Sequence, residues 1–396
     1  MFVDEKLQFN QVNIALEEDD VIIQIQGSIY HSALLTSKGE VYTWGLNNYG
    51  QLGKMTNMSD PLIVHITDEF HLNDDEVIVD IAVGAAHTLA LSSNHRLFGF
   101  GSNNYGQITD VQFAVSFEPR DITDHFSLGE DEDIIMVETG YYHNIVVTNK
   151  QRVFTWGYNS DGQLGDGSTV DRFMPVDITE HFLFRQGETV EKIGVGSTFS
   201  VLLTSEGSVY TWGNNEYGQL GNDTIESSLY PINITDFFNL DDEDLIFNIG
   251  TGAFHSLAFT DQGKVYAWGS NTVSQLATVT SIDYIALPID ITDRFDLDSQ
   301  DIVNEIIVGG AFNGVLTQHN KLLVWGVNHH GQLGTFDLEE KLIPFDIINH
   351  FYIKDYQEIT YIEFSGTYSF VVIDGKTIYA FGSNTYGELG VGDRVN

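Results

Sequence analysis

Histidines and acidic side chains recur in this sequence at spacings that could support metal binding or acid–base chemistry. Imidazole is a common ligand of Zn²⁺, and clustered carboxylates supply the oxygen ligands that Ca²⁺ prefers. Acid–histidine neighbours, as in Asp124-His125 and Glu180-His181, are the pairs that general acid–base catalysis uses. Whether such groups converge depends on the elements that carry them. The four histidines that share one spacing are His31, His87, His143 and His255.

All of these residues belong to a sequence unit that is repeated seven times. The first copy of its central phrase reads Trp44-Gly-Leu-Asn-Asn-Tyr-Gly-Gln-Leu-Gly53, and successive copies are separated by 56, 56, 56, 56, 57 and 56 residues. A period this regular indicates one supersecondary unit in seven copies, and predicts a single domain over residues 1–396. The aromatic residues that open the copies are Trp44, Phe100, Trp156, Trp212, Trp268, Trp325 and Phe381.

Each unit contains about four short runs that are typical of β-strands. In one unit, residues 144–148 and 153–156 are rich in β-branched and aromatic residues and flank a polar turn, which predicts a β-hairpin. In other units the same turn contains a glycine, which supplies the positive φ that such turns favour. These glycines are Gly39, Gly207, Gly263 and Gly375.

A short helical turn is predicted from the phrase Asp-Ile-Thr-Asp-x-Phe, which occurs for example at residues 121–126. Its Ile and Phe are four residues apart and therefore share one helix face. Thr123 is expected to cap the turn, and Asp124 to lie at the positive end of the helix dipole.

Four strands in each of seven units predict an all-β fold, a closed seven-bladed β-propeller of four-stranded blades, each with a short helical turn. An open solenoid is the alternative, but the terminal units are not the atypical capping repeats that a solenoid needs. The chain ends 15 residues after Phe381, before the strand that follows in the other units. The missing strand and helical turn are expected from Leu7 to Ile14, so that the N-terminal strand completes the last blade.

The polar residues that recur at fixed positions are interpreted as structural. Every unit has an asparagine in the loop after the aromatic residue, and a repeated amide is expected to hydrogen-bond buried backbone; ligand binding is the alternative. Equivalent histidines spread around seven units cannot converge within the roughly 2 Å bonds of a metal site. The residues assigned structural roles are His31, His87, His143, His255, Trp44, Trp156, Trp212, Trp268, Trp325, Asn47, Asn159 and Asn215.

The remaining chemical signals are interpreted in the same way, so that we expect no metal, no cofactor and no catalytic residue. The acid–histidine neighbours vary freely between units. Acidic loops at 17–20, 73–76, 130–133 and 241–244 lack the spacing of a dedicated Ca²⁺ loop and are expected to be solvated. The glycine-rich loops lack the Lys-Ser/Thr of a phosphate-binding loop.

Composition restricts the partners. The chain has 17 Lys and Arg against 57 Asp and Glu, a formal net charge of −40, which repels nucleic acid and anionic membranes. Basic proteins, cations or neutral surfaces are the expected partners, and solubility alone is the alternative reason for the charge. With no cysteine, the chain has no disulfide. The sequence favours a cytoplasmic location, or an exported one if a leader was removed.

The aromatic-Gly-x-Asn-x-x-Gly-Gln-Leu-Gly phrase, preceded 13 residues earlier by Gly-x-x-His-Ser/Thr, resembles the regulator of chromosome condensation repeat family. The resemblance covers essentially the whole chain and implies a seven-bladed propeller. Members of this family include a guanine-nucleotide exchange factor for the small GTPase Ran, ubiquitin-ligase modules, an inhibitor of β-lactamases and bacterial effectors. The chain departs from the exchange factor in lacking a basic tail and a blade insertion.

We therefore expect a monomeric, non-enzymatic scaffold that binds a protein partner through loops on one face. A guanine-nucleotide exchange factor for a small GTPase is the alternative. The segments after each Gln-Leu-Gly diverge most between units and contain aromatic residues, which are favoured interface anchors; that they only cover neighbouring blades is the other interpretation. Tyr49, Tyr105, Tyr217 and Tyr386 are expected to be structural. The candidate binding residues are Phe113, Phe117, Phe173, Tyr230, Tyr284 and Phe336.

Overall fold

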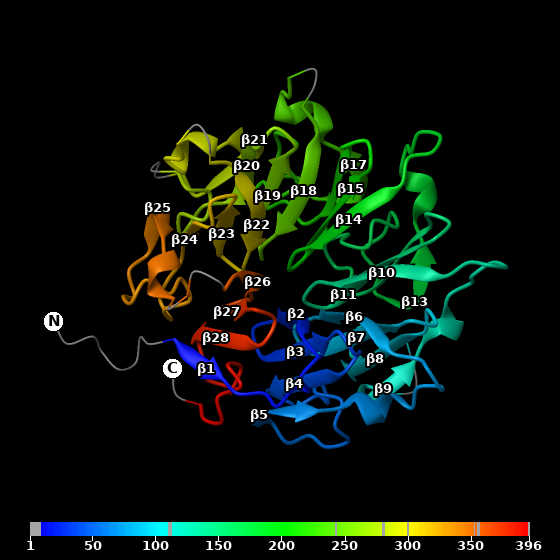
Figure 1. The fold of residues 1–396 in the computed structure, drawn as a ribbon. Helices are drawn as coiled ribbons and strands as arrows, with labels where there is room; N and C mark the ends of the chain where they lie inside the picture. The colour runs from blue at the N-terminus through cyan, green and yellow to red at the C-terminus, as the bar shows by residue number, and fades with distance from the viewer. Residues whose placement is uncertain are drawn as a thin grey trace. The chain divides into compact units, whose positions relative to one another are not determined.

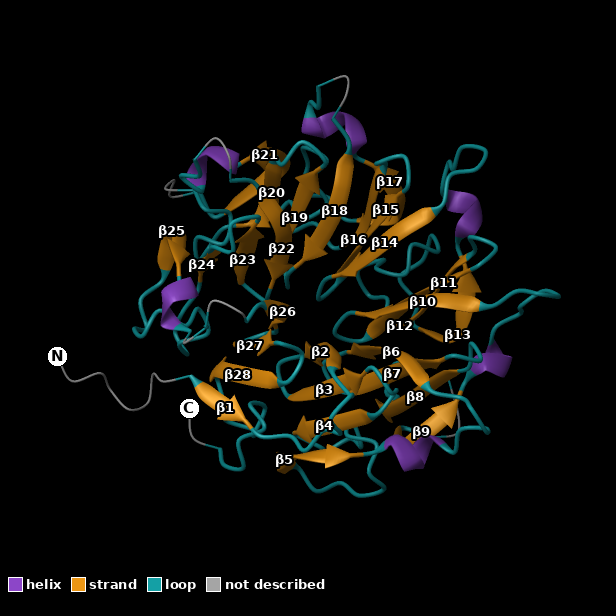
Figure 2. Ribbon diagram, in the orientation of Figure 1, coloured by secondary structure: helices purple, strands orange, loops and turns teal. Residues whose placement is uncertain are grey.

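A computed structural model describes residues 9–109, 113–241, 244–278, 282–298, 301–351, 353–354 and 357–394. Within these ranges, strands predominate and form seven four-stranded antiparallel sheets (Figures 1 and 2). The predicted fold class, an all-β seven-bladed propeller, is confirmed. The chain divides into two compact units, which are described separately here, and its being a single domain stays a prediction. One unit comprises Met1–Tyr158, Asp171–Asp177 and Ile353–Asn396, and the other Asn159–Val170 and Ile178–Tyr352.

The first unit contains four of the described sheets, each built from strands that pair with their neighbours along the chain. Their strands are β2 (Ile22–Gly27), β3 (His31–Thr36), β4 (Val41–Gly45) and β5 (Asp60–His65); β6 (Ile78–Val83), β7 (His87–Ser92), β8 (Leu97–Ser102) and β9 (Val115–Asp121); β10 (Ile134–Thr139), β11 (His143–Thr148), β12 (Val153–Gly157) and β13 (Arg172–Asp177); and β26 (Ile359–Phe364), β27 (Tyr368–Ile373), β28 (Thr377–Gly382) and β1 (Asn10–Val12).

The last of these sheets joins the two ends of the chain. Strand β1 pairs antiparallel with β28, with Asn10 opposite Ala380 and Val12 opposite Ile378. Val12 is buried with Ile378 in the core of this sheet. The prediction that an N-terminal strand completes the last blade is confirmed, although Leu7 lies outside the described residues.

The second unit contains the other three described sheets, with the same order of strands. Their strands are β14 (Val190–Val195), β15 (Phe199–Thr204), β16 (Val209–Gly213) and β17 (Ser228–Asn233); β18 (Ile246–Thr251), β19 (His255–Thr260), β20 (Val265–Ser270) and β21 (Tyr284–Asp290); and β22 (Val303–Val308), β23 (Phe312–Thr317), β24 (Leu322–Gly326) and β25 (Lys341–Asp346).

The second strand of each sheet is buried on both faces. In β3, Leu34 packs in one hydrophobic cluster, whereas its neighbours Ala33 and Leu35 pack in the next cluster along the chain. This division follows from the alternation of side chains along a strand. Such strands therefore appear as continuous apolar runs in the sequence. The sheet of β3 shares its core with one neighbouring sheet on each side.

A single 3-10 turn follows the fourth strand in six of the described sheets. The predicted isoleucine and phenylalanine are buried in each, for example Ile122 and Phe126. The prediction that threonine caps the turn is wrong. The hydroxyl of Thr123 instead accepts a hydrogen bond from the backbone N–H of Leu97 at the start of β8, while Asp121 accepts from the N–H of Thr123. The turns are η2 (Thr67–Phe70), η3 (Thr123–His125), η4 (Thr179–His181), η5 (Thr235–Phe238), η6 (Thr292–Arg294) and η7 (Ile348–His350).

The predicted seventh helical turn is not formed after β1. The described residues 13–20 contain no 3-10 helix and only a turn at 18–19, in which the N–H of Asp20 donates to the carbonyl of Glu17. Among the helical segments that the structure describes, none is long and apolar enough to cross a membrane.

Candidate protein-interaction surface

The repeated asparagine shapes the loop that follows each third strand. In the first sheet, the Asn47 Oδ1 accepts a hydrogen bond from the N–H of Leu52, and its Nδ2 donates to the carbonyl of Thr56 at 2.6 Å. Asn103 makes the same contacts with Ile108 and with the carbonyl of Phe113. One amide thus holds both the tight glycine turn and the start of the divergent segment. The asparagine fixes where that segment leaves the sheet, and so which of its side chains face solvent.

The repeated tryptophans link neighbouring sheets within each unit. Trp156 is fully buried, and its Nε1 donates to the carbonyl of Gln107 in the preceding loop at 2.9 Å. Trp212, Trp268 and Trp325 donate in the same way to the carbonyls of Gln163, Gln219 and Gln275. Nε1 of Trp44 donates to the carbonyl of Glu388, which stands at the glutamine position in the last copy.

The four repeated histidines are fully buried. Nε2 of His87 lies 2.7 Å from Oδ1 of Asn144, and Nε2 of His255 lies 2.7 Å from Oδ1 of Asn313. His31 contacts the hydroxyl of Thr88 at 2.9 Å. The imidazoles of His31, His87 and His255 therefore each join their strand to the next sheet of the same unit. In the part of the chain that the structure describes, no three His, Asp or Glu side chains form a group that could hold a metal ion.

Burial keeps these imidazoles neutral. It lowers the pKa of His31 to about 3, and the pKa values of His87 and His255 to about 4. The hydrogen bonds to Asn144 and Asn313 raise the pKa values of His87 and His255. Burial lowers them by more, because the charged imidazole would lose its hydration. These histidines are suited to holding sheets together at neutral pH and not to exchanging protons with a substrate.

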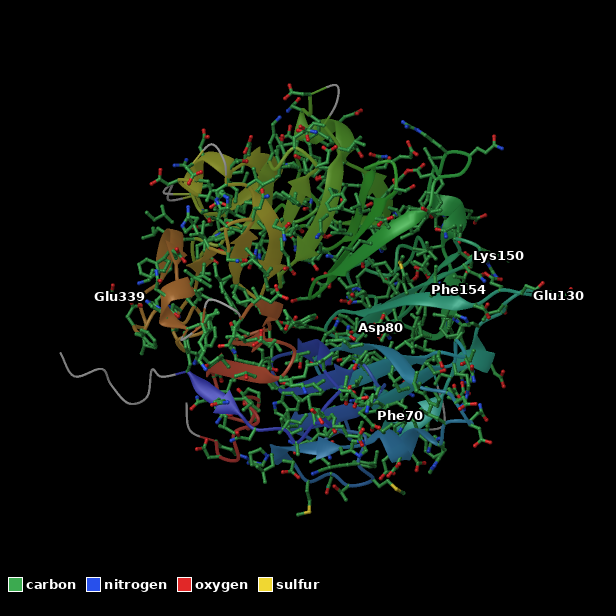
Figure 3. All side chains as sticks on the ribbon, viewed as in Figure 1. Phe70, Asp80, Glu130, Lys150, Phe154 and Glu339 are labelled. Atoms are coloured by element: carbon green, nitrogen blue, oxygen red, sulfur yellow. The ribbon has the colours of Figure 1, made fainter. Side chains whose placement is uncertain are left out.

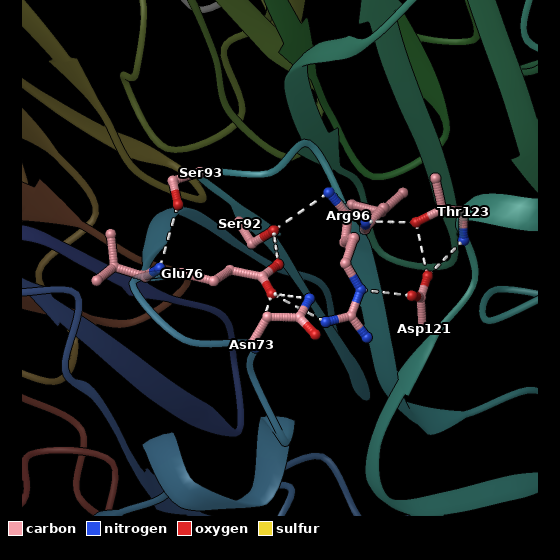
Figure 4. A network of polar contacts seen from close by, with 9 residues as sticks. Asn73, Glu76, Ser92, Ser93, Arg96, Asp121 and Thr123 are labelled. Atoms are coloured by element: carbon pink, nitrogen blue, oxygen red, sulfur yellow. Dashed lines mark hydrogen bonds and ion pairs between the residues drawn. The ribbon is translucent and has the colours of Figure 1, made fainter.

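The acidic loops contain a feature that the sequence interpretation missed. One carboxylate in each loop is buried, although other acids of these loops, such as Glu130 in Figure 3, are exposed. Glu76 is 5% exposed; it accepts hydrogen bonds from the Ser92 hydroxyl, from Asn73 and from the Arg96 guanidinium (Figure 4). Arg96 also donates to Asp121 at 2.7 Å. The expectation that these loops are simply solvated is therefore wrong for one residue of each loop.

The physical reason is that a buried charge is tolerated when hydrogen bonds and an opposite charge surround it. The signal was present in the sequence, because the buried acids follow the same intervals as the tryptophans. A Ser or Thr stands 16 residues after several of them, and Glu132–Thr148 and Asp301–Thr317 repeat the contact of Glu76 with Ser92. The buried acids are Asp20, Glu76, Glu132, Glu188, Asp244 and Asp301.

Replacing Glu76 by glutamine is expected to destabilise the protein by about 1–3 kcal/mol at pH 7, because charged hydrogen bonds are lost in a buried site. Burial opposes ionisation, but Ser92, Asn73 and Arg96 together hold the pKa of Glu76 below its usual value. The carboxylate therefore stabilises the fold at pH values above the ordinary glutamate pKa. This contribution is lost as the pH falls from there through the lowered pKa of Glu76 in the folded protein.

Urea unfolding measures this difference, with the exposed Glu130→Gln as a matched control that should stay within about 0.5 kcal/mol of the wild type. The difference in free energy of unfolding between the wild type and Glu76→Gln should become smaller below pH 4. An equal difference at pH 7 and pH 3 would contradict the role assigned to Glu76.

The acid–histidine neighbours are placed on the 3-10 turns. Asp124 and Glu180 are exposed, and the neighbouring His125 and His181 are half-buried. The ring of His181 packs edge-on against Tyr230, with centroids 4.9 Å apart. These histidines therefore contribute to the outer surface of the sheets.

The six aromatic residues predicted to bind a partner lie on the outermost strands or in the loops before them. Their exposed fractions range from 36% for Phe173 to 50% for Tyr230. Each also makes a local contact: the Arg120 guanidinium lies over the ring of Phe113 at 4.4 Å, and the rings of Phe336 and His350 are 4.5 Å apart. The backbone of Phe173 lies so close to Gly106 that a side chain there would clash. Both interpretations thus have a physical basis, because rings such as those of Phe113 and Phe336 pack locally and remain partly exposed to solvent.

Further exposed apolar side chains surround these aromatics. In the first unit, Met55 donates its backbone N–H to the carbonyl of Phe117, so its loop runs beside β9. Met55, Met58 and Leu62 are more than half exposed. In the second unit, Ile225 and Ile282 precede strands β17 and β21 and are likewise exposed. Apolar surface of this kind, with methionine and aromatic residues together, is typical of protein-binding sites.

Comparisons with known proteins agree with this architecture. A family model described as the RCC1-like domain matches residues 3–299 and 119–396. The ultraviolet-B receptor UVR8 of Arabidopsis thaliana is 28% identical over 332 residues, which are 83% of this chain and 70% of that protein. The X-linked retinitis pigmentosa GTPase regulator homolog of Caenorhabditis elegans is 29% identical over 313 residues, but these cover only 21% of its own length.

Solved structures give the same fold. Yeast RCC1 (Prp20), in a structure bound to Kap60, has a TM-score of 0.73 and 18% sequence identity, and the match covers 97% of this chain and 89% of that one. A second structure of Prp20p, from Saccharomyces cerevisiae, was reported together with its binding properties to Gsp1p and histones; its TM-score is 0.70 at 18% identity, over 93% of this chain and 84% of that one.

Proposed function

Because this chain belongs to the RCC1-like domain family, we propose that it is a non-enzymatic scaffold that binds a protein partner through its outermost strands and the loops before them. The observation that carries the proposal is the exposure of the six aromatic residues from Phe113 to Phe336 beside further exposed apolar side chains. Aromatic and methionine side chains anchor protein interfaces because they bury much apolar area at little cost in conformational entropy.

The charge of the chain limits the proposed partner. A formal net charge of −40 attracts basic proteins and repels nucleic acid and anionic membranes. We therefore propose a basic protein partner, bound by a monomer of this chain, with no nucleic acid, membrane or cofactor involved.

A comparative pull-down tests the proposal. The triple variant Phe113→Ser, Phe117→Ser, Phe173→Ser alters three exposed aromatics of the first unit, and partners that use this surface should be recovered at least tenfold less by quantitative mass spectrometry. The control variant Leu183→Ser, Leu245→Ser removes apolar side chains that are also exposed but lie in the segments before β14 and β18, the first strands of their sheets. Equal recovery by wild type and both variants would contradict the proposal.

A guanine-nucleotide exchange factor for a small GTPase is the second candidate. It is favoured by the relative named as a GTPase regulator homolog and by the likeness of the fold to Prp20p, whose binding to Gsp1p has been studied. Such a protein acts by displacing nucleotide from the GTPase, so no covalent chemistry is needed in the propeller. Release of fluorescent GDP from a panel of small GTPases separates the two candidates, because a pure scaffold leaves the rate of release unchanged.

A further inference from the structure

Six tyrosines gather at one end of the four sheets of the first unit. Two of them directly precede β3 and β11, the second strands of their sheets, and one directly follows β12, the third strand of its sheet. The other three lie in the loops after β4, β8 and β28. In an antiparallel sheet, the connection between strands one and two lies at the same end as the connection between strands three and four. The topology therefore brings these loops together, and the six residues are called the tyrosine cluster below. They are Tyr30, Tyr49, Tyr105, Tyr142, Tyr158 and Tyr386.

The rings of the tyrosine cluster pack against one another across neighbouring sheets. Tyr105, Tyr142 and Tyr158 form a triangle, with ring centroids 4.8–6.4 Å apart and the planes steeply inclined. Tyr30 and Tyr386 form an edge-on pair at 5.3 Å. Burial first, and then Tyr30, Tyr105 and Tyr49, raise the pKa of Tyr142. Inclined packing of this kind holds each ring in one orientation.

The tyrosine cluster is nevertheless accessible. Tyr49 is 43% exposed and the other five are half-buried, so the cluster is a fixed surface and not part of the core. In the described loops of this end of the unit, the basic residues are Lys54, whose side chain is paired with Asp60 at 2.9 Å, and Arg394 near the C-terminus. The surface thus offers aromatic rings and hydroxyls with little positive charge of its own.

Two glutamates lie at the same end of the innermost strands of this unit. Glu138 is the next-to-last residue of β10, and Glu363 is the next-to-last residue of β26. Glu363 accepts a hydrogen bond from the N–H of Gly27 at the end of β2. Burial, and then the charge of Glu138, raise the pKa of Glu363 to about 8. The Glu363 carboxyl therefore resists ionising in this position, and a cation placed near it would favour its charged form.

Arginine makes the closer of the cation–ring contacts described in this chain, since Lys341 lies 5.8 Å from the centroid of Phe345. The guanidinium groups of Arg96, Arg120 and Arg152 lie 4.4–4.7 Å from the centroids of Phe98, Phe113 and Phe154. Each is planar and stacks on a ring face, which a lysine ammonium does less well. The described arginine–ring contacts all use phenylalanine, and the tyrosine cluster offers a second, larger set of ring faces.

We propose that the tyrosine cluster binds an arginine-bearing basic segment of the partner protein, whose guanidinium groups stack on the exposed tyrosine faces. The inference rests on the proposed function, since it names one surface and the chemistry of the partner. A second copy of this chain is a poor occupant, because two molecules of net charge −40 repel each other. Fixed aromatic rings favour binding because little side-chain entropy is lost on association.

The test uses the full chain and two fluorescein-labelled peptides of equal length and charge, one alternating arginine with serine and the other lysine with serine. At about 0.15 M salt, long-range attraction to the acidic surface is screened, so fluorescence anisotropy reports mainly close contacts. The arginine peptide is expected to bind about tenfold more tightly than the lysine peptide. Equal affinities would overturn the proposal, because attraction by net charge alone would then explain binding.

Three variants locate the site. Tyr105→Ser with Tyr142→Ser should weaken binding of the arginine peptide about tenfold, whereas Tyr105→Phe with Tyr142→Phe keeps the rings and should retain it. The matched control, Phe237→Ser with Phe247→Ser, removes exposed aromatic rings of the second unit that belong to neither proposed surface and should have no effect. Equal loss in the control, or in the phenylalanine variant, would overturn the assignment. Thermal unfolding of each variant checks that it is folded.

Nitration by tetranitromethane, followed by mass spectrometry, gives a second measurement that depends on position. The bound arginine peptide should protect Tyr105 and Tyr142 and leave Tyr230 reactive. Protection that appears on concentrating the protein alone would identify a second copy as the occupant and overturn the proposal. If the arginine peptide does not bind the wild type, the proposed tyrosine site is also overturned. The proposed scaffold function is tested separately, by the pull-down with the variant in which Phe113, Phe117 and Phe173 are replaced by serine.

Discussion

Deletion of residues 1–16 is expected to lower the midpoint of thermal unfolding by roughly 4–7 °C, corresponding to a loss of about 3–6 kcal/mol. The deletion removes β1, whose residues pair with β28, together with the buried Val12 and the half-buried Ile14 and Leu16 that pack in the same core. Strand β28 then becomes an exposed edge, which favours aggregation.

The matched control for this prediction is deletion of residues 1–8, which precede β1. That variant keeps the pairing of Asn10, Gln11 and Val12 with β28 and should unfold close to the wild type. Calorimetry compares the three proteins. Equal midpoints for the two deletions would contradict the role assigned to β1. We also propose that the wild type unfolds in one transition, as a single domain of seven blades would; two separate transitions would contradict that proposal.

The second large effect concerns pH. Each of His31, His87 and His255 is neutral in the folded protein, with a pKa of about 3 or 4, whereas an unfolded histidine has a pKa near 6.5. Between these values the unfolded chain binds more protons than the folded one. Stability is therefore complete above about pH 6.5 and falls as the pH drops toward 4, by roughly 2 kcal/mol per histidine at pH 5.

The chain itself suggests the variant that tests this effect. Phenylalanine stands at the equivalent position of the fourth copy, where Phe199 is fully buried, and a serine, Ser256, takes the place of the partner asparagine. His87→Phe alone leaves the buried Asn144 Oδ1 without its partner and should cost about 1–3 kcal/mol at pH 7. His87→Phe with Asn144→Ser reproduces the Phe–Ser pair and should recover most of that loss.

The double variant should also lose less stability than the wild type between pH 7 and pH 5, by about 2 kcal/mol. Urea unfolding at several pH values measures the difference. The exposed His329→Phe serves as the control and should follow the wild-type curve. If the double variant and the wild type lose the same stability over this interval, His87 is not the source of the pH dependence.

The period of the sequence was sufficient to predict the architecture. The intervals between Trp44 and Phe381 give the number of blades, and the position of the C-terminus relative to the last copy predicts the strand that pairs with β28. The same period could have identified the buried acid of each loop, such as Glu76. It was missed because acidic clusters were judged by their composition, which is that of a solvated loop, and not by the position of each residue within the repeat.

Other features could not be derived from any one repeat. Thr123 was expected to cap its own turn, but its hydroxyl contacts Leu97 at the start of β8, far away in the sequence. The hydroxyl of Thr123 accepts from the backbone N–H of Leu97, which strand pairing alone would leave without an acceptor, and therefore does not cap its own turn. The partners of His31 and His87 are likewise placed by the packing of one sheet on the next.

What the sequence alone determined is the repeated element: its strands, its glycine turns, its buried aromatic residue and the number of copies. These depend on local geometry and on hydrophobic periodicity, which a linear pattern records. What the tertiary structure decided is which polar groups meet and which aromatics remain accessible. Tyr105 and Phe113 belong to one loop, yet the first joins a tyrosine cluster drawn from several sheets and the second lies under Arg120. Such contacts depend on the distance between residues in space, which spacing along the chain does not specify.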